Sequence, residues 1–252
     1  MTAEARHAEI VRELQSSESV SVVDLARKLD TSEVTIRRDL AELEQTGVLR
    51  RVRGGAVSAT LRGDEMPFAM REMEAAEQKT RIAAAAVRLI ADAEAVVLDS
   101  GTTGLAAARQ LTGRRVTVMP LSVGSIGVLS AATGVSLLLP GGNVRRGELS
   151  VVGPLTEQCL AALRFDTVLL TCCGIANRHG VTAHDLQDAA VKRRAIASSA
   201  RVIAMVDGSK FSKTAMAVVC PVTDIDIVVT DTDAPADEVA ALRASGVEVH
   251  CV

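Results

Sequence analysis

The first 57 residues carry a helical pattern of apolar positions. Residues 4–16 form an amphipathic segment, and a short β-prone stretch, SVSV at 19–22, leads into a second helical segment. In the third segment Ile36, Leu40 and Leu43 fall on one narrow stripe of a helix. The pattern predicts three short helices that share one small core.

The outer face of the third helix is polar and basic. Thr31 or Ser32 can cap this helix, with Glu33 near its positive end. Because the apolar stripe points inward, the first turns present their other side chains outward, as a helix that reads the DNA major groove does. The predicted DNA contacts of this segment are Ser32, Val34, Thr35, Arg37 and Arg38. Among them Arg38 and Thr35 are expected at base edges, Val34 near a thymine methyl group, and Arg37 at a phosphate.

A basic hairpin follows the third helix. Gly47 ends the helix, and VLRRVRGGAV is typical of two short strands with Gly54-Gly55 at the turn. Arg50, Arg51 and Arg53 on this hairpin are predicted phosphate contacts. Three helices and a basic wing predict a winged helix-turn-helix over residues 1–57.

From residue 79 onward, helical segments alternate with continuous apolar runs. AVVLD at 95–99, FDTVLLT at 165–171 and RVIAMVD at 201–207 are examples of these runs. Such runs are typical of strands buried on both faces, so residues 79–252 are predicted to form an α/β domain with a mostly parallel sheet. Residues 58–78 have mixed polarity and no sustained period, and we expect them to be a linker that partly packs on the second domain.

The composition fits two globular domains and narrows the kind of nucleic acid they could bind. The chain has 252 residues, is 48% hydrophobic, and has no Trp or Tyr and three Phe. Stacking of bases on aromatic side chains, the main device of single-strand and RNA readers, is therefore nearly unavailable. No run of 18 apolar residues and no signal-like N-terminus occur, so we expect a cytoplasmic protein with no membrane segment.

Positive charge is local rather than general. The formal net charge is −3, and residues 1–57 contain nine Arg or Lys residues against ten Asp or Glu residues. The arginines of the third helix and the hairpin nevertheless form a patch that can bind phosphates. One such module is expected to bind DNA weakly, so useful affinity requires two copies paired through the second domain.

The cysteines and histidines give no sign of a metal or redox centre. The five cysteines show no CxxC or Cys/His spacing, and His179, His184 and His250 lack the partner spacing of a triad or a metal site. Cys172 and Cys173 end an apolar run, where buried thiols are the simpler interpretation and a redox or metal role is the alternative. We expect no metal and no cofactor.

Loops suited to an anion follow several predicted strands. Ser100, Gly101, Thr102 and Thr103 open a helix, where hydroxyl groups, small residues and the helix N-terminus favour negative charge. Ligands of open α/β sheets bind at the carboxyl ends of the strands, so these loops are predicted to share a crevice for a small phosphorylated metabolite. Each loop alone also fits an ordinary capped helix or turn. The other loop residues in this set are Gly141, Gly142, Arg145 and Lys210.

The helix DLQDAAVKRRAIASS offers charged groups to the same crevice. Asp188 and Lys192 are spaced for an i,i+4 pair, and surface pairing is the alternative to a role in the site.

Over nearly the whole chain these motifs resemble those of DeoR-family transcriptional regulators. SVSVVDLARKLDTSEVTIRRDLAELEQTGVLRRVRGGAV resembles the DNA-binding region of the family. VLDSGTT, LLPGGNVR, FDTVLL, AAVKRRAI and DGSKF stand in the order of the family's sugar-phosphate-sensing domain, which is similar to ribose-5-phosphate isomerase and CoA-transferase-like folds. The resemblance implies a repressor of a carbohydrate catabolic operon. It would act as a homo-oligomer, a dimer or a tetramer, on double-stranded operator DNA, and a phosphorylated sugar would release it.

The resemblance also implies an effector site on this chain. Its residues would be Ser100, Gly101, Thr102, Thr103, Ser122, Gly141, Gly142, Arg145, Gly174, Lys192 and Lys210. Three stretches depart from the family's pattern and bear on the identity of the effector: Pro120-Leu121-Ser122, Cys172-Cys173-Gly174 and Gly208-Ser209-Lys210.

Two other functions stay open at this point. The chain could be an activator or a regulator that ignores effectors. It could also be a phosphosugar isomerase or transferase, with Asp185, Asp188 and Lys210 as candidate acid–base groups.

Overall fold

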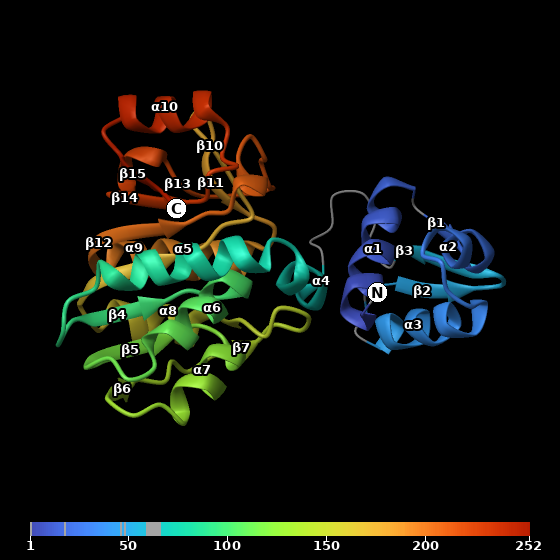
Figure 1. Ribbon diagram of the computed structural model, residues 1–252. Helices are drawn as coiled ribbons and strands as arrows, with labels where there is room; N and C mark the ends of the chain where they lie inside the picture. Colours follow the sequence, from blue (N-terminus) through green and yellow to red (C-terminus); the bar gives the residue numbers. More distant parts are fainter. Residues whose placement is uncertain (1, 18, 46, 48, 59–66) are drawn as a thin grey trace. The chain divides into compact units, whose positions relative to one another are not determined.

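The chain forms two compact units, each with its own core (Figure 1). The computed structural model describes residues 2–17, 19–45, 47, 49–58 and 67–252. The first unit spans Met1–Glu74 and the second Ala75–Val252.

The first unit is a winged helix-turn-helix, as the apolar pattern predicts. A three-stranded sheet with the order β1-β3-β2 lies beside its helices. In chain order its elements are α1 (Ala3–Ser16), β1 (Ser19–Ser21), α2 (Val22–Lys28), α3 (Glu33–Gln45), β2 (Leu49–Val52), β3 (Gly55–Ser58) and α4 (Phe68–Met73).

The core of this unit is formed by the predicted apolar stripe of α3 together with side chains of the other helices and of the wing. Ile36, Leu40 and Leu43 of α3 are buried against side chains of α1, α2 and β2. Ser32 caps α3, because its hydroxyl accepts a hydrogen bond from the Thr35 amide at 3.1 Å. Gly55 is required where the wing meets β1, since a Cβ at this position would collide with the Val20 carbonyl oxygen.

The segment predicted as a linker contains ordered structure. Residues 59–66 lie outside the described residues, but Phe68–Met73 form α4, and Met70 is buried in the core of the first unit. The sequence predicts that the segment packs partly on the second domain, and residues 75–78 do belong to the second unit, whereas Phe68–Met73 pack on the first. A helix of six residues is too short to show a periodic pattern in the sequence.

The second unit is built on a seven-stranded sheet in which every neighbouring pair is parallel, as the alternating pattern predicts. Its strand order is β15-β14-β12-β9-β4-β5-β6. These strands are β4 (Ala95–Leu98), β5 (Val116–Pro120), β6 (Val135–Leu137), β9 (Phe165–Leu170), β12 (Ser199–Met205), β14 (Ile227–Thr230) and β15 (Glu248–Cys251).

Helices cover both faces of this sheet. Alternate strand residues enter two separate cores: Val97 and Val168 face one, whereas Val96 and Leu169 face the other. The helices are α5 (Ala76–Arg88), α6 (Gly101–Leu111), α7 (Val123–Ser130), α8 (Pro154–Ala161), α9 (Leu186–Ala197) and α10 (Ala236–Ala244).

A small antiparallel sheet on one face is an addition that the sequence did not predict. Its order is β10-β11-β13, and its side chains Ile175, Val181 and Val219 join one of the two cores. The strands are β10 (Gly174–Ala176), β11 (Gly180–Ala183) and β13 (Ala217–Cys220), and a separate hairpin pairs β7 (Asn143–Val144) with β8 (Val151–Val152).

The strand order places a topological switch point between β4 and β9. The chain runs outward from β4 through β5 to β6 and then returns to β9 on the other side of β4. The carboxyl ends of β4 and β9 therefore lie side by side where the winding direction reverses, which is where open α/β sheets bind ligands.

Candidate DNA-binding surface and ligand site

The N-terminal half of α3 presents the side chains that the sequence analysis placed outward. Val34 is 73% exposed, and Arg37 and Arg38 are also exposed. Thr35 is half-buried, and its hydroxyl lies 2.9 Å from the Ser32 hydroxyl. An exposed apolar side chain between polar groups suits contact with a base edge in the major groove.

Three arginines of this surface are held by glutamates of α3. Arg37 Nη2 lies 2.6 Å from Glu33 Oε2, and Arg38 Nε lies 3.0 Å from Glu42 Oε1. On the wing, Arg51 Nε lies 2.8 Å from Glu44 Oε2. Arg50 and Arg53 are exposed and form no ion pair with any residue in the described ranges.

A buried ion pair that the sequence analysis missed fixes α3 to α1. Arg6 donates to both oxygens of Asp39, at 2.8 Å from Nε and 3.0 Å from Nη2, and Asp39 is 2% exposed. His7 Nε2 lies 3.3 Å from Asp39 Oδ1 and 3.6 Å from Glu42 Oε2. Asp39 lies next to the apolar stripe of α3. This position on the helix is the sequence feature from which its burial could have been predicted.

The ligand atoms of His7, Asp39 and Glu42 lie within 4.8 Å of one another, a spacing that could suit a cation. Both Asp39 oxygens, however, already accept hydrogen bonds from the Arg6 guanidinium. A metal ion would have to displace that cation, so this arrangement fits an ion pair better than a metal centre.

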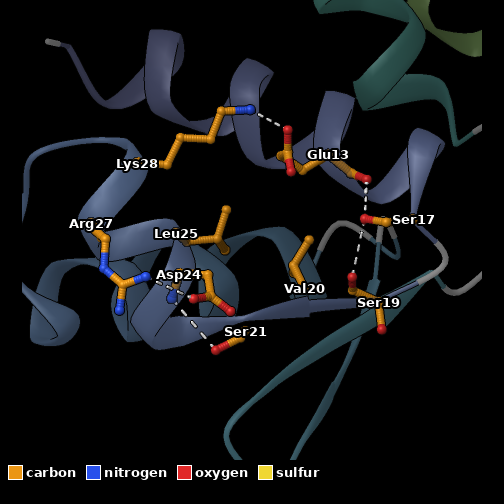
Figure 2. Close-up of a pocket in the computed structure, with 9 residues that line it drawn as sticks. All are labelled: Glu13, Ser17, Ser19, Val20, Ser21, Asp24, Leu25, Arg27 and Lys28. Carbon is orange, nitrogen blue, oxygen red and sulfur yellow. Dashed lines mark hydrogen bonds and ion pairs between the residues drawn. The ribbon is translucent and has the colours of Figure 1, made fainter.

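A hollow of about 370 Å³ lies among α1, β1 and α2 of the first unit (Figure 2). Val20 and Leu25 form its apolar part, and its charged side chains pair with each other: Lys28 with Glu13, and Arg27 with Asp24 at 3.5 Å. It therefore lacks the character of the anion site that the sequence predicts.

At the switch point of the second unit, Asp99 connects β4 to β9. Its Oδ2 accepts hydrogen bonds from the Thr171 amide at 2.8 Å and the Thr171 hydroxyl at 3.0 Å. Thr171, directly after β9, is a residue of this site that the sequence analysis did not single out. The carboxylate is 2% exposed and pairs with Lys192 of α9.

Lys192 is buried between two carboxylates. It pairs with Asp99, and its Nζ lies 3.5 Å from Asp188 Oδ2, one helical turn earlier on α9. Burial opposes its charged form, but Asp188 and Asp99 outweigh that effect and raise the pKa of Lys192 above its usual value. The predicted i,i+4 pair therefore exists, but it lies in the interior rather than on the surface.

The loop Ser100–Thr103 lies beside this ion pair. The Ser100 hydroxyl lies 3.4 Å from Asp188 Oδ1, and Gly101 begins α6 with a φ of 87°. Thr102 and Thr103 are each 6% exposed, and neither hydroxyl bonds to another residue of the described chain. Two nearly buried donors at a helix N-terminus are suited to an anion.

Lys210 belongs to the same neighbourhood. It lies in the short 3-10 helix Gly208–Lys210 after β12, and it forms no ion pair with a described residue. Its charge and that of Lys192 both act on the Cys172 thiol, whose pKa is raised chiefly by burial and then by Cys173. Lys210 is thus a cation near the switch point whose charge is not neutralised by a carboxylate in contact with it.

Other residues of the predicted site have structural contacts of their own. Ser122 caps α7, and Gly141 accepts a hydrogen bond from the Thr156 hydroxyl at 2.7 Å. Gly142 packs against Thr156 so closely that a Cβ would collide with it, and Gly174 packs in the same way against the Lys213 backbone. Arg145 lies on the hairpin, with its Nε 3.4 Å from the Ser150 hydroxyl.

A winged helix-turn-helix joined to an α/β unit with a switch-point site defines a DNA-binding regulator with a sensor unit. The DeoR-like helix-turn-helix domain matches residues 6–62, and the DeoR C-terminal sensor domain matches residues 74–232. The chain belongs to the DeoR family of transcriptional regulators.

Proteins named as transcriptional repressors are similar to this chain over most of their length. The putative aga operon transcriptional repressor of Escherichia coli O157:H7 is 34% identical over 98% of this chain and 93% of that protein. The HTH-type transcriptional repressor GlcR of Bacillus subtilis is 31% identical over 92% of this chain and 89% of that protein.

Among solved structures, ribose 5-phosphate isomerase A from Methanocaldococcus jannaschii aligns with a TM-score of 0.42 at 15% identity, covering 56% of each chain. The helices of the described residues were also compared with the length and hydropathy that a membrane span requires, and none of them meets both.

Proposed function

We propose that this protein represses a carbohydrate-utilisation operon and that a phosphorylated sugar, or a related metabolite, releases it from operator DNA. The observation that supports the sensing role most directly is the arrangement at the switch point. Two nearly buried threonine hydroxyls at the start of α6 have no partner in the described chain, and Lys210 nearby is not ion-paired.

The proposed anion site consists of the N-terminus of α6 together with Lys210. Backbone amides and the hydroxyls of Thr102 and Thr103 would donate hydrogen bonds to a phosphate, and Lys210 would neutralise part of its charge. Lys192 has a different role, because Asp99 and Asp188 already neutralise it.

On DNA, α3 would enter the major groove. Arg38 and Thr35 would contact base edges, with Val34 near a thymine methyl group, while Arg37, Arg50, Arg51 and Arg53 would contact phosphates. A homo-oligomer would place two such helices about one turn of DNA apart.

The proposal does not include catalysis. The carboxylate nearest the sensing loop, Asp99, is hydrogen-bonded to Thr171 and paired with Lys192, so it is not available as a general base.

The test is a two-step screen. Sugar phosphates are first screened by thermal shift with an added dye, because the chain has no Trp or Tyr. Compounds that bind are then tested for release of DNA selected by the protein from a random pool, beside the same sugars without phosphate. The proposal expects release by a phosphorylated compound and weaker release in Lys210→Ala. A ligand that binds and leaves DNA affinity unchanged would contradict it.

A further inference from the structure

We infer that the second unit binds a second copy of this chain through one end of its large sheet, where α7, β6 and the hairpin β7–β8 meet. Figure 1 shows β6 as the last strand at that end, with α7 beside it. The inference locates the pairing of copies that the proposed function requires, and in that respect it rests on the proposed function. We call this surface the β6 edge, and its exposed large apolar side chains are Val123, Leu138, Leu139, Val144, Leu149 and Leu155.

The β6 edge is almost free of charged side chains. No Asp, Glu, Lys, Arg or His occurs from Val116 to Val144, although charged residues make up 23% of the chain, and this stretch includes the whole of α7 and β6. A surface helix ordinarily carries charged residues on its outer face, as α10 does in its first and last turns. The outer face of α7 instead presents Val123 and Gly127. Depletion of charge is typical of the core of an interface between proteins.

Exposed apolar side chains gather on this edge. Six of the thirteen large apolar side chains that are exposed in the described chain lie between Val123 and Leu155. The elements that carry them touch one another. The Val123 amide donates to the Leu149 carbonyl oxygen at 2.9 Å, and a Cβ at Gly141 would lie 3.8 Å from the Leu155 Cβ, so the loop after β6 lies against α8. Exposed apolar side chains gathered in this way mark a site of protein association.

The two ends of the large sheet differ in how they are protected. β6 pairs with β5 on one side, and no strand of the described chain pairs with its other side. At the opposite end, β15 carries Glu248 and His250, whose side chains lie 2.6 Å apart. Charged side chains protect an edge strand from pairing with another chain. Because β15 has such protection and β6 does not, β6 is the end of the sheet that is suited to being covered.

The lack of charge also indicates which partner covers this edge. Around a two-fold axis each side chain faces the same side chain of the other copy, so a charged residue near the axis would meet its own charge. An uncharged apolar surface meets a copy of itself without that repulsion. DNA and strongly charged proteins are recognised by opposite charge, which the β6 edge does not offer. Two copies joined here carry two winged helices, as the proposed function requires.

The experiment compares full-length Leu139→Lys with Leu186→Lys. The two leucines are 61% and 63% exposed, but Leu186 begins α9 and lies outside the β6 edge. Mass is measured by sedimentation velocity at micromolar concentration without DNA. We expect two chains, or a multiple of two, for the native protein and for Leu186→Lys, and half that mass or less for Leu139→Lys. The lysine pair that Leu139→Lys places at the axis should raise the dissociation constant of the pair at least about tenfold.

A second variant tests the surface rather than one side chain. Leu155→Lys changes a residue of α8 that is 62% exposed, and the same loss of mass is expected. All three substitutions replace exposed side chains, so circular dichroism melting should match that of the native protein. Native protein that sediments as a single chain, a native mass in both Leu139→Lys and Leu155→Lys, or an equal loss of mass in Leu186→Lys would each overturn the inference.

DNA affinity of the same proteins tests the proposed function separately. The added lysine cannot weaken DNA binding through its own charge, so weaker binding in Leu139→Lys but not in Leu186→Lys would report the loss of pairing. If Leu139→Lys has half the native mass and native DNA affinity, the β6 edge is upheld and the need for two paired recognition helices is contradicted.

Discussion

Lys192 Nζ lies 3.5 Å from Asp188 Oδ2 in the interior of the second unit, and the same ammonium group pairs with Asp99. This arrangement joins α9 to the ends of β4 and β9, and through Asp188 it reaches the Ser100 hydroxyl. One cation thus holds together three elements that surround the proposed ligand site. We infer that Lys192 positions the sensing loop rather than binding the effector.

Lys192→Met should destabilise the second unit by about 3–5 kcal/mol, because it leaves Asp99 buried without its cation. Urea denaturation of the full chain measures this loss. The double variant Asp99→Asn with Lys192→Met should lose less than Lys192→Met alone, since only one of the two carboxylates beside Lys192 then keeps its charge. Lys213→Met changes an exposed lysine and should stay within about 0.5 kcal/mol of the native protein. A small loss in Lys192→Met would mean that water or a rearrangement satisfies Asp99.

The contribution of Lys192 to stability should not change with pH in the neutral range. Its folded pKa is raised, so the contribution is complete below the ordinary lysine value of about 10.4 and is lost only as the pH rises through the higher folded value. The difference in unfolding free energy between native protein and Lys192→Met should thus be the same at about pH 6 and about pH 9. A difference that disappears between those values would contradict the buried, charged state.

Gly55→Ala should separate the wing from β1. The added Cβ would collide with the Val20 carbonyl oxygen, and we expect a loss of about 1–3 kcal/mol together with weaker DNA binding. Gly127→Ala is the matched control, because nothing lies within 4 Å of a Cβ there. Circular dichroism melting and a DNA-binding titration report the two effects. Equal melting temperatures and equal DNA affinities of the two variants would show that the close β1–β3 contact is not required for stability or for DNA binding.

Met70→Ala should destabilise the winged helix although Met70 lies beyond the DNA-binding motif in sequence. Met70 is 6% exposed within the core of the first unit, and loss of a buried methionine costs about 2–5 kcal/mol. Hydrogen exchange of the α1 and α3 amides should become faster. Met216→Ala, at a side chain that is 73% exposed, should leave those amides unchanged. Unchanged hydrogen exchange in Met70→Ala would contradict the packing of α4 in the core of the first unit.

The sequence predicts those parts of the fold that depend on local periodicity. The stripe Ile36, Leu40 and Leu43 identifies α3, and runs such as AVVL and FDTVLL identify strands buried on both faces. Two features are not predicted. The six residues of α4 are too short for a helical period to emerge. The small sheet depends on the pairing of β11 with β13, which lies far from it in the sequence.

The candidate site is only partly predictable. The position of Ser100–Thr103 after a strand follows from the order of the elements, and the spacing of Asp188 and Lys192 follows from helix geometry. The burial of Lys192 against Asp99 does not, because it depends on strands β4 and β9 becoming neighbours across the switch point. The pairing of Arg6 with Asp39 likewise depends on how α1 packs against α3.

The most direct test of the account is the reciprocity between effector and DNA. Affinity for the sugar phosphate found by the screen is measured by calorimetry on free protein and on protein saturated with its selected DNA. Linkage requires the DNA to weaken sugar-phosphate binding by the same factor by which the sugar phosphate weakens DNA binding, typically about 5- to 150-fold. Equal affinity for the free and the DNA-bound protein would contradict the proposal that the switch-point site controls DNA binding.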